Sequence, residues 1–272
     1  MLTISNPDKV LFPDADITKG ELADYYSKVA TRMLPYIRNR GFSLVMCPSG
    51  IGNDCFYVKR KRQGSYQKNN KTGEPLDPIS TVEEVLTFVQ NNAIEFHMYL
   101  SEIESLPDVL VFDLDPDEGM NLTQVRKGVR DLKSLLDELG FVSFLKTSGN
   151  KGYHIVVPVK AEAEWETFSS FAKNIAIVME KKWPKLYTTN IRKANRKGRI
   201  FVDWIRNTKG ATAVVPYSVR AKTGARVSMP IGWDELETVA PDGITIKDAL
   251  NRFDRNPWEK YFTIRMTQWL KQ

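Results

Sequence analysis

The order of apolar strands and amphipathic helices between residues 94 and 205 constrains the fold most strongly. Apolar patterns predict strands at 94–99, 109–115, 141–146, 153–159 and 200–205, with helices at 122–139 and 162–181. Only the six residues Thr147–Gly152 separate the third of these strands from the fourth, which indicates a hairpin. Because a doubly wound sheet connects parallel strands through helices, the hairpin favours an α/β fold with a mixed or antiparallel sheet.

The residues before this region predict two more helices and a strand. Thr18 and Glu21 have the spacing of a capping box, so a helix is expected from about 18 to 37. A strand is expected at 42–46, and Ser80 begins a second helix that ends near 91. A length of 272 residues suits one large domain or two tightly packed small ones, and the chain contains no linker or repeat.

Composition excludes several classes of protein. Hydrophobic residues make up 42% of the chain, so disordered and fibrous proteins are excluded. No apolar run is long enough for a membrane helix and no leader pattern is present, so we expect a soluble protein that is not exported. Two cysteines, Cys47 and Cys55, are expected to be reduced and partly buried. With only two histidines, a zinc site is poorly supplied.

The net charge of +6 hides a strong segregation of charge. Residues 188–226 contain ten Lys or Arg and one acid, Asp203, and residues 59–71 contain six Lys or Arg and no acid. Without these two tracts the chain has a net charge of −9. The tracts therefore indicate a surface for a polyanion, although two solvated loops remain the alternative.

Three acidic residues are candidates for metal binding. Asp113 and Asp115 end an apolar strand, and residues two apart on a strand point to the same face. Like charges held close are unfavourable unless a cation neutralises them, and Mg²⁺ or Mn²⁺ prefers carboxylate oxygens. Asp203, on another predicted strand, is a third candidate, and the set is suited to two-metal phosphoryl transfer. The alternative is that Asp113 and Asp115 are exposed acids at a strand end.

Two further segments have residues suited to nucleotides. The turn between the hairpin strands contains Ser148 and Lys151 between two glycines, a composition that can present backbone N–H groups and an ammonium to phosphates. An ordinary hairpin is the alternative. Phe56 and Tyr57 precede the basic run that starts at Lys59, a combination that can stack bases and follow a nucleic-acid backbone, although a core role for the aromatics stays open.

With these motifs in order, the sequence resembles the archaeo-eukaryotic primase superfamily, and in particular the polymerase domain of ATP-dependent DNA ligase D, the end-joining polymerase. The resemblance runs nearly end to end and implies an α/β fold with an RNA-recognition-motif-like mixed sheet. It also implies a single primase-polymerase domain over 1–272, with an N-terminal αβ part at about 1–90 packed on a catalytic sheet at about 91–272. The matching segments are Ser5–Pro13, Thr18–Lys19, Phe56–Lys59, Glu95–His97, Pro107–Pro116, Lys146–His154, Asp203–Asn207, Tyr217–Ala221, Pro230 and Trp233–Leu236.

The resemblance also implies roles for single residues. Asp113, Asp115 and Asp203 would be catalytic and hold two Mn²⁺ or Mg²⁺ ions. For the nucleotide, His97 would contact the sugar and favour a 2′-hydroxyl, the triphosphate would be bound by Ser148, Lys151 and Arg220, and the bases would be contacted by Phe56 and Tyr57. For the DNA, a 5′-phosphate would be bound by Asn6, Lys9 and Lys19, and further contacts would be made by Lys59, Arg196 and Arg206. His154 is expected to be structural or to orient the substrate. Arg206 departs from the glutamine common in the family, which leaves the contact at this position open.

The function expected from these residues is template-directed nucleotidyl transfer that fills gaps and extends DNA ends in non-homologous end joining, with a preference for ribonucleotides. NTP or dNTP and gapped duplexes with a 5′-phosphate would be its substrates, Ku and a separate DNA ligase are candidate partners, and the expected location is the cytoplasm, at the nucleoid. The alternatives are a primase that starts chains de novo, a two-metal nuclease, and a non-catalytic module that binds DNA ends.

Overall fold

The computed structural model describes residues 3–62, 65–66 and 74–270, which form two compact units. Unit 1 consists of residues 1–103, 212–229 and 243–255, and unit 2 consists of residues 104–211, 230–242 and 256–272. The chain therefore passes between the units several times, and each unit combines segments that are distant in sequence. The sequence-based prediction of one domain with a boundary near residue 90 stays a prediction.

Unit 2 contains a six-stranded mixed sheet in the order β12-β13-β9-β11-β10-β15. The central strand β9 is antiparallel to both neighbours, and only β12 and β13 are parallel, which confirms the predicted mixed sheet. Its strands are β9 (Val109–Pro116), β10 (Phe144–Thr147), β11 (Tyr153–Pro158), β12 (Tyr187–Thr188), β13 (Ile200–Asp203) and β15 (Pro230–Ile231). Its helices are α3 (Leu122–Glu138), α4 (Trp165–Lys182) and α6 (Tyr261–Thr267).

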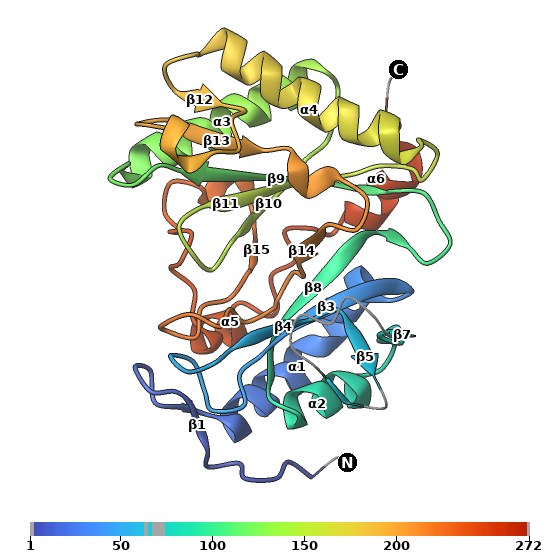
Figure 1. Ribbon diagram of the computed structural model, residues 1–272, viewed down its shortest axis with the longest axis vertical. Coiled ribbons are helices and arrows are strands. Elements are labelled where there is room, and N and C mark those ends of the chain that lie inside the picture. Colours follow the sequence, from blue (N-terminus) through green and yellow to red (C-terminus); the bar gives the residue numbers. More distant parts are fainter. Residues whose placement is uncertain (1–2, 63–64, 67–73, 271–272) are drawn as a thin grey trace. The chain divides into compact units, whose positions relative to one another are not determined.

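Helices α3 and α4 lie on the same side of this sheet (Figure 1). A Cβ atom on Gly128 of α3 would be 3.1 Å from Ile200 Cδ1 and 3.3 Å from Leu114 Cδ1, so the glycine allows the helix to approach the sheet closely. Because neighbouring strand residues alternate between faces, Asp113 and Asp115 point away from α3. The packing of α3 thus determines which face of the sheet is available for chemistry.

Two predicted strands in unit 2 are shorter than expected. Strand β10 begins at Phe144 and not at Phe141, because the N–H of Phe141 bonds to the carbonyl of Leu136 and continues the C-terminal turn of α3. Strand β13 ends at Asp203, because the Asp203 carboxylate accepts the N–H of Arg206 and starts a short 3₁₀ turn at residues 205–207.

Unit 1 contains a four-stranded antiparallel sheet in the order β14-β8-β3-β4, and helices α1 and α2 pack against each other and against β3 and β8 (Figure 1). Thr18 and Glu21 form the predicted capping box of α1. The sheet strands are β3 (Arg40–Met46), β4 (Phe56–Val58), β8 (Ala93–Glu102) and β14 (Thr212–Val214). The other strands are β1 (Val10–Phe12), β2 (Ile17–Thr18), β5 (Arg60–Arg62), β6 (Ser65–Tyr66) and β7 (Glu74–Pro75), and the helices are α1 (Lys19–Ile37), α2 (Val82–Gln90) and α5 (Ile246–Asn251).

The expectation of reduced cysteines is wrong in this structure. Cys47 and Cys55 form a disulfide, with their Cα atoms 4.3 Å apart. Strand β3 pairs with β4 in a register that sets Met46 opposite Phe56. Cys47, which follows Met46, therefore lies opposite Cys55, which precedes Phe56. The β3–β4 hairpin thus brings together two cysteines that are eight residues apart in sequence. The number of cysteines alone did not predict this pairing.

No helix in the described ranges is both long and apolar enough to cross a membrane. Of the basic run predicted between residues 59 and 71, residues 63–64 and 67–71 lie outside the described residues.

Candidate active site

The three predicted catalytic aspartates lie on one face of the unit 2 sheet. Asp113 and Asp115 are on β9, and Asp203 on β13 is the direct cross-strand partner of Asp113. Directly opposite residues have their side chains on the same face, as do residues two apart on one strand. The register of two antiparallel strands therefore brings together acids that are 90 residues apart in sequence.

Two arginines neutralise these carboxylates in the structure. Arg196 Nη1 lies 2.6 Å from Asp115 Oδ2, and Arg206 Nη2 lies 3.1 Å from Asp203 Oδ2. The Arg196 side chain is 9% exposed and also donates to the backbone carbonyls of Asn190 and Ile191. Both arginines, which the resemblance assigns to DNA, thus contact the proposed metal-binding carboxylates.

The Asp203 side chain is the most buried of the three carboxylates. Burial raises the pKa of this carboxyl above its usual range, while the Arg206 guanidinium lowers it and the charge of Asp113 raises it again. A cation placed between the two carboxylates would favour their ionised forms. The electrostatics therefore match the predicted use of Asp113 and Asp203 as ligands of a positive ion.

The donor chemistry fits a hard divalent cation, since three carboxylates are the ligands that Mg²⁺ and Mn²⁺ prefer. Among the described residues, however, no group of three or more His, Cys, Asp or Glu side chains is arranged as a metal site. In this structure Asp115 and Asp203 each contact a guanidinium group. A metal ion at Asp115 and Asp203 would compete with these contacts.

The row of polar side chains continues across the sheet beyond Asp113. His154 on β11 is the cross-strand partner of Asp113, and Lys146 on β10 is the partner of His154. Lys146 Nζ lies 2.8 Å from His154 Nδ1, and His154 Nε2 lies 3.6 Å from Asp113 Oδ2. A charged lysine can only donate, so Nδ1 accepts, and in a neutral ring the proton is on Nε2, toward Asp113. This contact supports an orienting role for His154, and sequence reasoning assigned no role to Lys146.

The predicted phosphate-binding turn has a defined backbone conformation. Ser148 Oγ accepts hydrogen bonds from the N–H groups of Asn150 and Gly152, at 3.1 and 3.3 Å. Gly152 cannot be replaced without a shift, because a Cβ atom there would lie 2.7 Å from the carbonyl oxygen of Leu114. The turn therefore packs directly against β9, the strand that bears Asp113 and Asp115.

A cavity of about 320 Å³ lies where β9 ends and the turn begins. Exposed Lys151 and its neighbour Asn150 line one part of it, and Pro116, Asp117 and Gly119 line another. Three acids, Asp117, Glu118 and Asp242, and two residues of α3, Leu122 and Val125, line it as well, so the cavity itself is not suited to a phosphate. Ser148 shapes the turn, and Lys151 supplies its charge.

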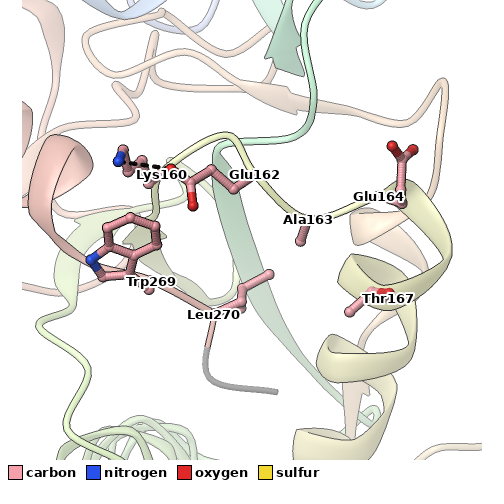
Figure 2. Close-up of a pocket in the computed structure, with 7 residues that line it drawn as sticks. All are labelled: Lys160, Glu162, Ala163, Glu164, Thr167, Trp269 and Leu270. Carbon is pink, nitrogen blue, oxygen red and sulfur yellow. Dashed lines mark ion pairs between the residues drawn. The ribbon is translucent and has the colours of Figure 1, made fainter.

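A second cavity in unit 2, of about 380 Å³, contains none of the predicted site residues (Figure 2). Lys160 Nζ lies 3.9 Å from the centre of the Trp269 ring and 2.7 Å from Glu162 Oε1. These contacts account for the main charged and aromatic groups of the cavity, and it has no part in the candidate active site.

Unit 1 holds the residue predicted to contact the sugar and one of the residues predicted to contact the triphosphate. His97 on β8 is buried, at 7% exposed, and its Nε2 atom lies 2.7 Å from Glu95 Oε2. Arg220 Nε lies 3.2 Å from Glu95 Oε1. The predicted half-buried strand is thus buried on both faces as far as Met98, because ion pairs satisfy its polar face. Glu95 connects the two predicted residues and was not itself predicted; its position two residues before His97 was the available signal.

The predicted base contacts lie on the neighbouring part of the same sheet. Tyr57 on β4 is 49% exposed, and its ring meets that of His97 edge to face at 5.7 Å. Phe56 is half-buried, and Lys59, which follows the strand, is exposed. An exposed aromatic ring next to His97 is available for stacking, whereas Phe56 is less accessible.

Hydrogen bonds of the backbone bring the predicted 5′-phosphate residues together. The N–H of Lys9 bonds to the carbonyl of Asn6, and the N–H of Lys19 bonds to the carbonyl of Lys9. Lys19 Nζ donates to the Ser5 carbonyl at 3.0 Å, and Lys9 Nζ donates to the Pro48 carbonyl. Burial lowers the pKa of Lys19, and the charge of Lys9 lowers it further. Two ammonium groups close enough to repel each other are suited to an anion.

The mixed sheet with carboxylates on the face away from α3 and α4 defines a primase-like α/β fold, of the class found in nucleotidyltransferases. The chain belongs to the family described as LigD, primase-polymerase domain, whose model matches residues 18–258.

Curated relatives and a solved structure agree with this family. The chain is 34% identical to the multifunctional non-homologous end joining protein LigD of Pseudomonas aeruginosa over 95% of its length, and 31% identical to that of Mycolicibacterium smegmatis over 92%. It spans only 32% and 34% of those proteins. The polymerase domain of Mycobacterium tuberculosis ligase D, solved in complex with DNA, matches with a TM-score of 0.86 and 30% identity, over 97% of this chain and 98% of that domain.

Proposed function

We propose that this chain is a template-directed DNA/RNA polymerase that fills gaps and extends ends at DNA double-strand breaks in non-homologous end joining. The observation behind this proposal is the cross-strand pair Asp113 and Asp203, with Asp115 on the same face of the sheet. The relatives named for end joining and the similar domain in complex with DNA support this assignment.

Asp113, Asp115 and Asp203 hold two divalent cations, Mn²⁺ or Mg²⁺, in this proposal. When bound, such ions favour deprotonation of the primer 3′-hydroxyl and stabilise the charge that develops on the leaving pyrophosphate. Arg196 and Arg206 neutralise two of the carboxylates in the structure, and with metal ions bound they would be available for DNA phosphates. His154, held through Nδ1 by Lys146, keeps Asp113 oriented by its Nε2 atom.

The remaining residues bind the incoming nucleotide. Lys151 and the N–H groups of its turn, ordered by Ser148, are proposed contacts of the triphosphate in unit 2, and Arg220 is the proposed contact in unit 1. His97 contacts the 2′-hydroxyl and thereby favours ribonucleotides, and Tyr57, assisted by Phe56, contacts the bases. His97 is suited to this role because its ring is buried and held by Glu95, so it can discriminate between sugars that differ by one hydroxyl.

The cluster of Asn6, Lys9 and Lys19 recognises the 5′-phosphate across the gap. A terminal phosphate has more charge than an internal one, and two close ammonium groups select for it. Lys59, Arg196 and Arg206 contact the DNA backbone, so we expect binding to weaken steeply with salt. Ku and a separate DNA ligase are the proposed partners, and the cytoplasm at the nucleoid is the proposed location.

Primer extension on a gapped duplex tests the proposal. The duplex contains a 5′-phosphate, and NTP or dNTP is supplied with Mn²⁺ or Mg²⁺. We expect incorporation by the wild type and its loss in Asp113→Asn, with Asp137→Asn, on the exposed surface of α3, as the control for loss of a carboxylate. No incorporation by the wild type, or full activity of Asp113→Asn, would refute the proposal. Dinucleotides made without a primer would indicate a primase, shortened DNA a nuclease, and metal-independent binding without turnover an end-binding module.

A further inference from the structure

One buried carboxylate in unit 1 connects the two predicted nucleotide contacts of that unit. Glu95 is the third residue of β8 and is 2% exposed. Its Oε2 atom bonds to His97 Nε2 at 2.7 Å, and its Oε1 atom accepts the N–H of Ala221 at 2.7 Å and lies 3.2 Å from Arg220 Nε. Both oxygens of the carboxylate are therefore occupied by groups next to, or part of, the proposed nucleotide site.

The same partners determine the pKa of Glu95. Burial by itself raises the pKa of a carboxyl, but the hydrogen bond from His97, the charges of Arg220 and His97 and the Ala221 N–H lower the pKa of Glu95 to about 2. The carboxylate is thus ionised throughout the neutral range. A buried charge that loses a partner is costly, so the same interactions that keep Glu95 ionised hold its partners in place.

The three groups come from segments that are far apart in sequence. His97 is two residues from Glu95 on the same face of β8, whereas Arg220 and Ala221 belong to the segment after β14. Ser218 Oγ accepts the N–H of Phe96 at 2.9 Å, so this segment is fixed beside β8 at a second point. The carboxylate therefore determines where the Arg220 guanidinium lies relative to the His97 ring.

The bond to Glu95 also determines the state of the His97 ring. A carboxylate accepts hydrogen bonds and does not donate them, so Nε2 of His97 holds a proton and the ring is oriented by this contact. The rings of Tyr57 and His97 also pack edge to face, with their centres 5.7 Å apart.

We propose that Glu95 is a positioning residue that couples sugar selection to triphosphate binding, by holding His97 and Arg220 in one fixed arrangement without contacting the nucleotide. This inference rests on the proposed polymerase function. Loss of the carboxylate changes two properties at once: His97 no longer discriminates between the sugars, and Arg220 no longer binds the triphosphate in the same position.

Steady-state kinetics on the phosphorylated gap separates these effects. We expect Glu95→Gln to lower the ratio of kcat/KM for NTP over dNTP to that of His97→Ala, and to raise KM for both nucleotides by at least fivefold with a smaller change in kcat. In the double variant Glu95→Gln/His97→Ala, the ratio falls no further. Glu83→Gln, an exposed residue of α2 in the same unit, is the matched control. A ratio in Glu95→Gln within twofold of wild type overturns the proposal.

A spectroscopic measurement tests the contact apart from catalysis. The chain has two histidines, His97 and His154, so the ring-nitrogen NMR signals are assigned with one His154→Gln variant. We expect the His97 signals to show a proton fixed on Nε2 in the wild type and exchange between tautomers in Glu95→Gln, and unchanged signals overturn the proposal. If the wild type does not incorporate nucleotides, the proposed function fails, and these signals still test the contact. If Glu95→Gln does not fold, Glu95→Asp replaces it, because its shorter side chain cannot reach His97 and Arg220 in the same arrangement. A wild-type NTP/dNTP ratio together with wild-type His97 signals in Glu95→Asp then overturns the proposal.

Discussion

The ion pair between Arg206 and Asp203 makes a quantitative prediction about metal binding. In Arg206→Gln, the guanidinium that lies 3.1 Å from Asp203 Oδ2 is removed, while the backbone N–H of residue 206 still bonds to Asp203 Oδ1. The Arg206 side chain is 38% exposed, so solvent screens the pair and its contribution is about 0.5 to 1 kcal/mol. A cation that binds Asp203 must first overcome this interaction. Its removal should therefore lower the metal concentration needed for half-maximal activity about two- to fivefold.

The assay is incorporation on the phosphorylated gap at saturating nucleotide, with Mn²⁺ titrated at pH 8. Arg192→Gln is the control, because Arg192 is an exposed residue of the same basic tract and its replacement removes the same charge. The control should leave the half-activating Mn²⁺ concentration unchanged. An unchanged or higher value in Arg206→Gln would refute the competition between Arg206 and the metal. A higher KM for nucleotide with unchanged metal dependence would instead assign Arg206 to the substrate.

Three further predictions concern other parts of the protein. His97→Ala should lower the preference for NTP over dNTP at least fivefold in competition assays, and an unchanged ratio would remove His97 from sugar selection. Lys9→Ala should reduce the advantage of a phosphorylated over an unphosphorylated gap, and an equal loss on both would contradict 5′-phosphate recognition. Asp203→Asn should raise the Tm of metal-free protein at neutral pH: burial raises the pKa of Asp203, so ionisation costs stability as pH rises through that pKa. This gain should shrink as the pH falls toward the usual range of Asp, and a lower Tm at all pH values would be inconsistent with it.

The sequence predicted the elements whose signals are local. The capping box at Thr18 and Glu21 begins α1, and the short turn between β10 and β11 forms the predicted antiparallel hairpin. Asp113 and Asp115 could be placed on one face because the period of a strand is two residues. Each of these inferences depends on residues within a few positions of one another, where backbone geometry leaves few alternatives.

Contacts that depend on strand register or on loops were not predictable in the same way. The Cys47–Cys55 disulfide depends on the pairing of Met46 with Phe56, and a shift of the hairpin register would separate the two cysteines. The contact of Arg196 with Asp115 bridges 81 residues and depends on the conformation of the loop before β13. The basic tract at residues 188–226 was evident in the sequence. The sequence did not show that Arg196 and Arg206 are the members of this tract that contact Asp115 and Asp203.

The polar row across the unit 2 sheet shows why register matters for the chemistry. Asp203, Asp113, His154 and Lys146 occupy successive strands, and each is the direct partner of the next. Shifting any one strand by a single residue would turn its member of the row to the face covered by α3, and would leave a buried Lys146 or His154 without the partner that it has here. The apolar packing of α3 and the polar row therefore require the same register. The packing that stabilises unit 2 thus also positions its candidate active site.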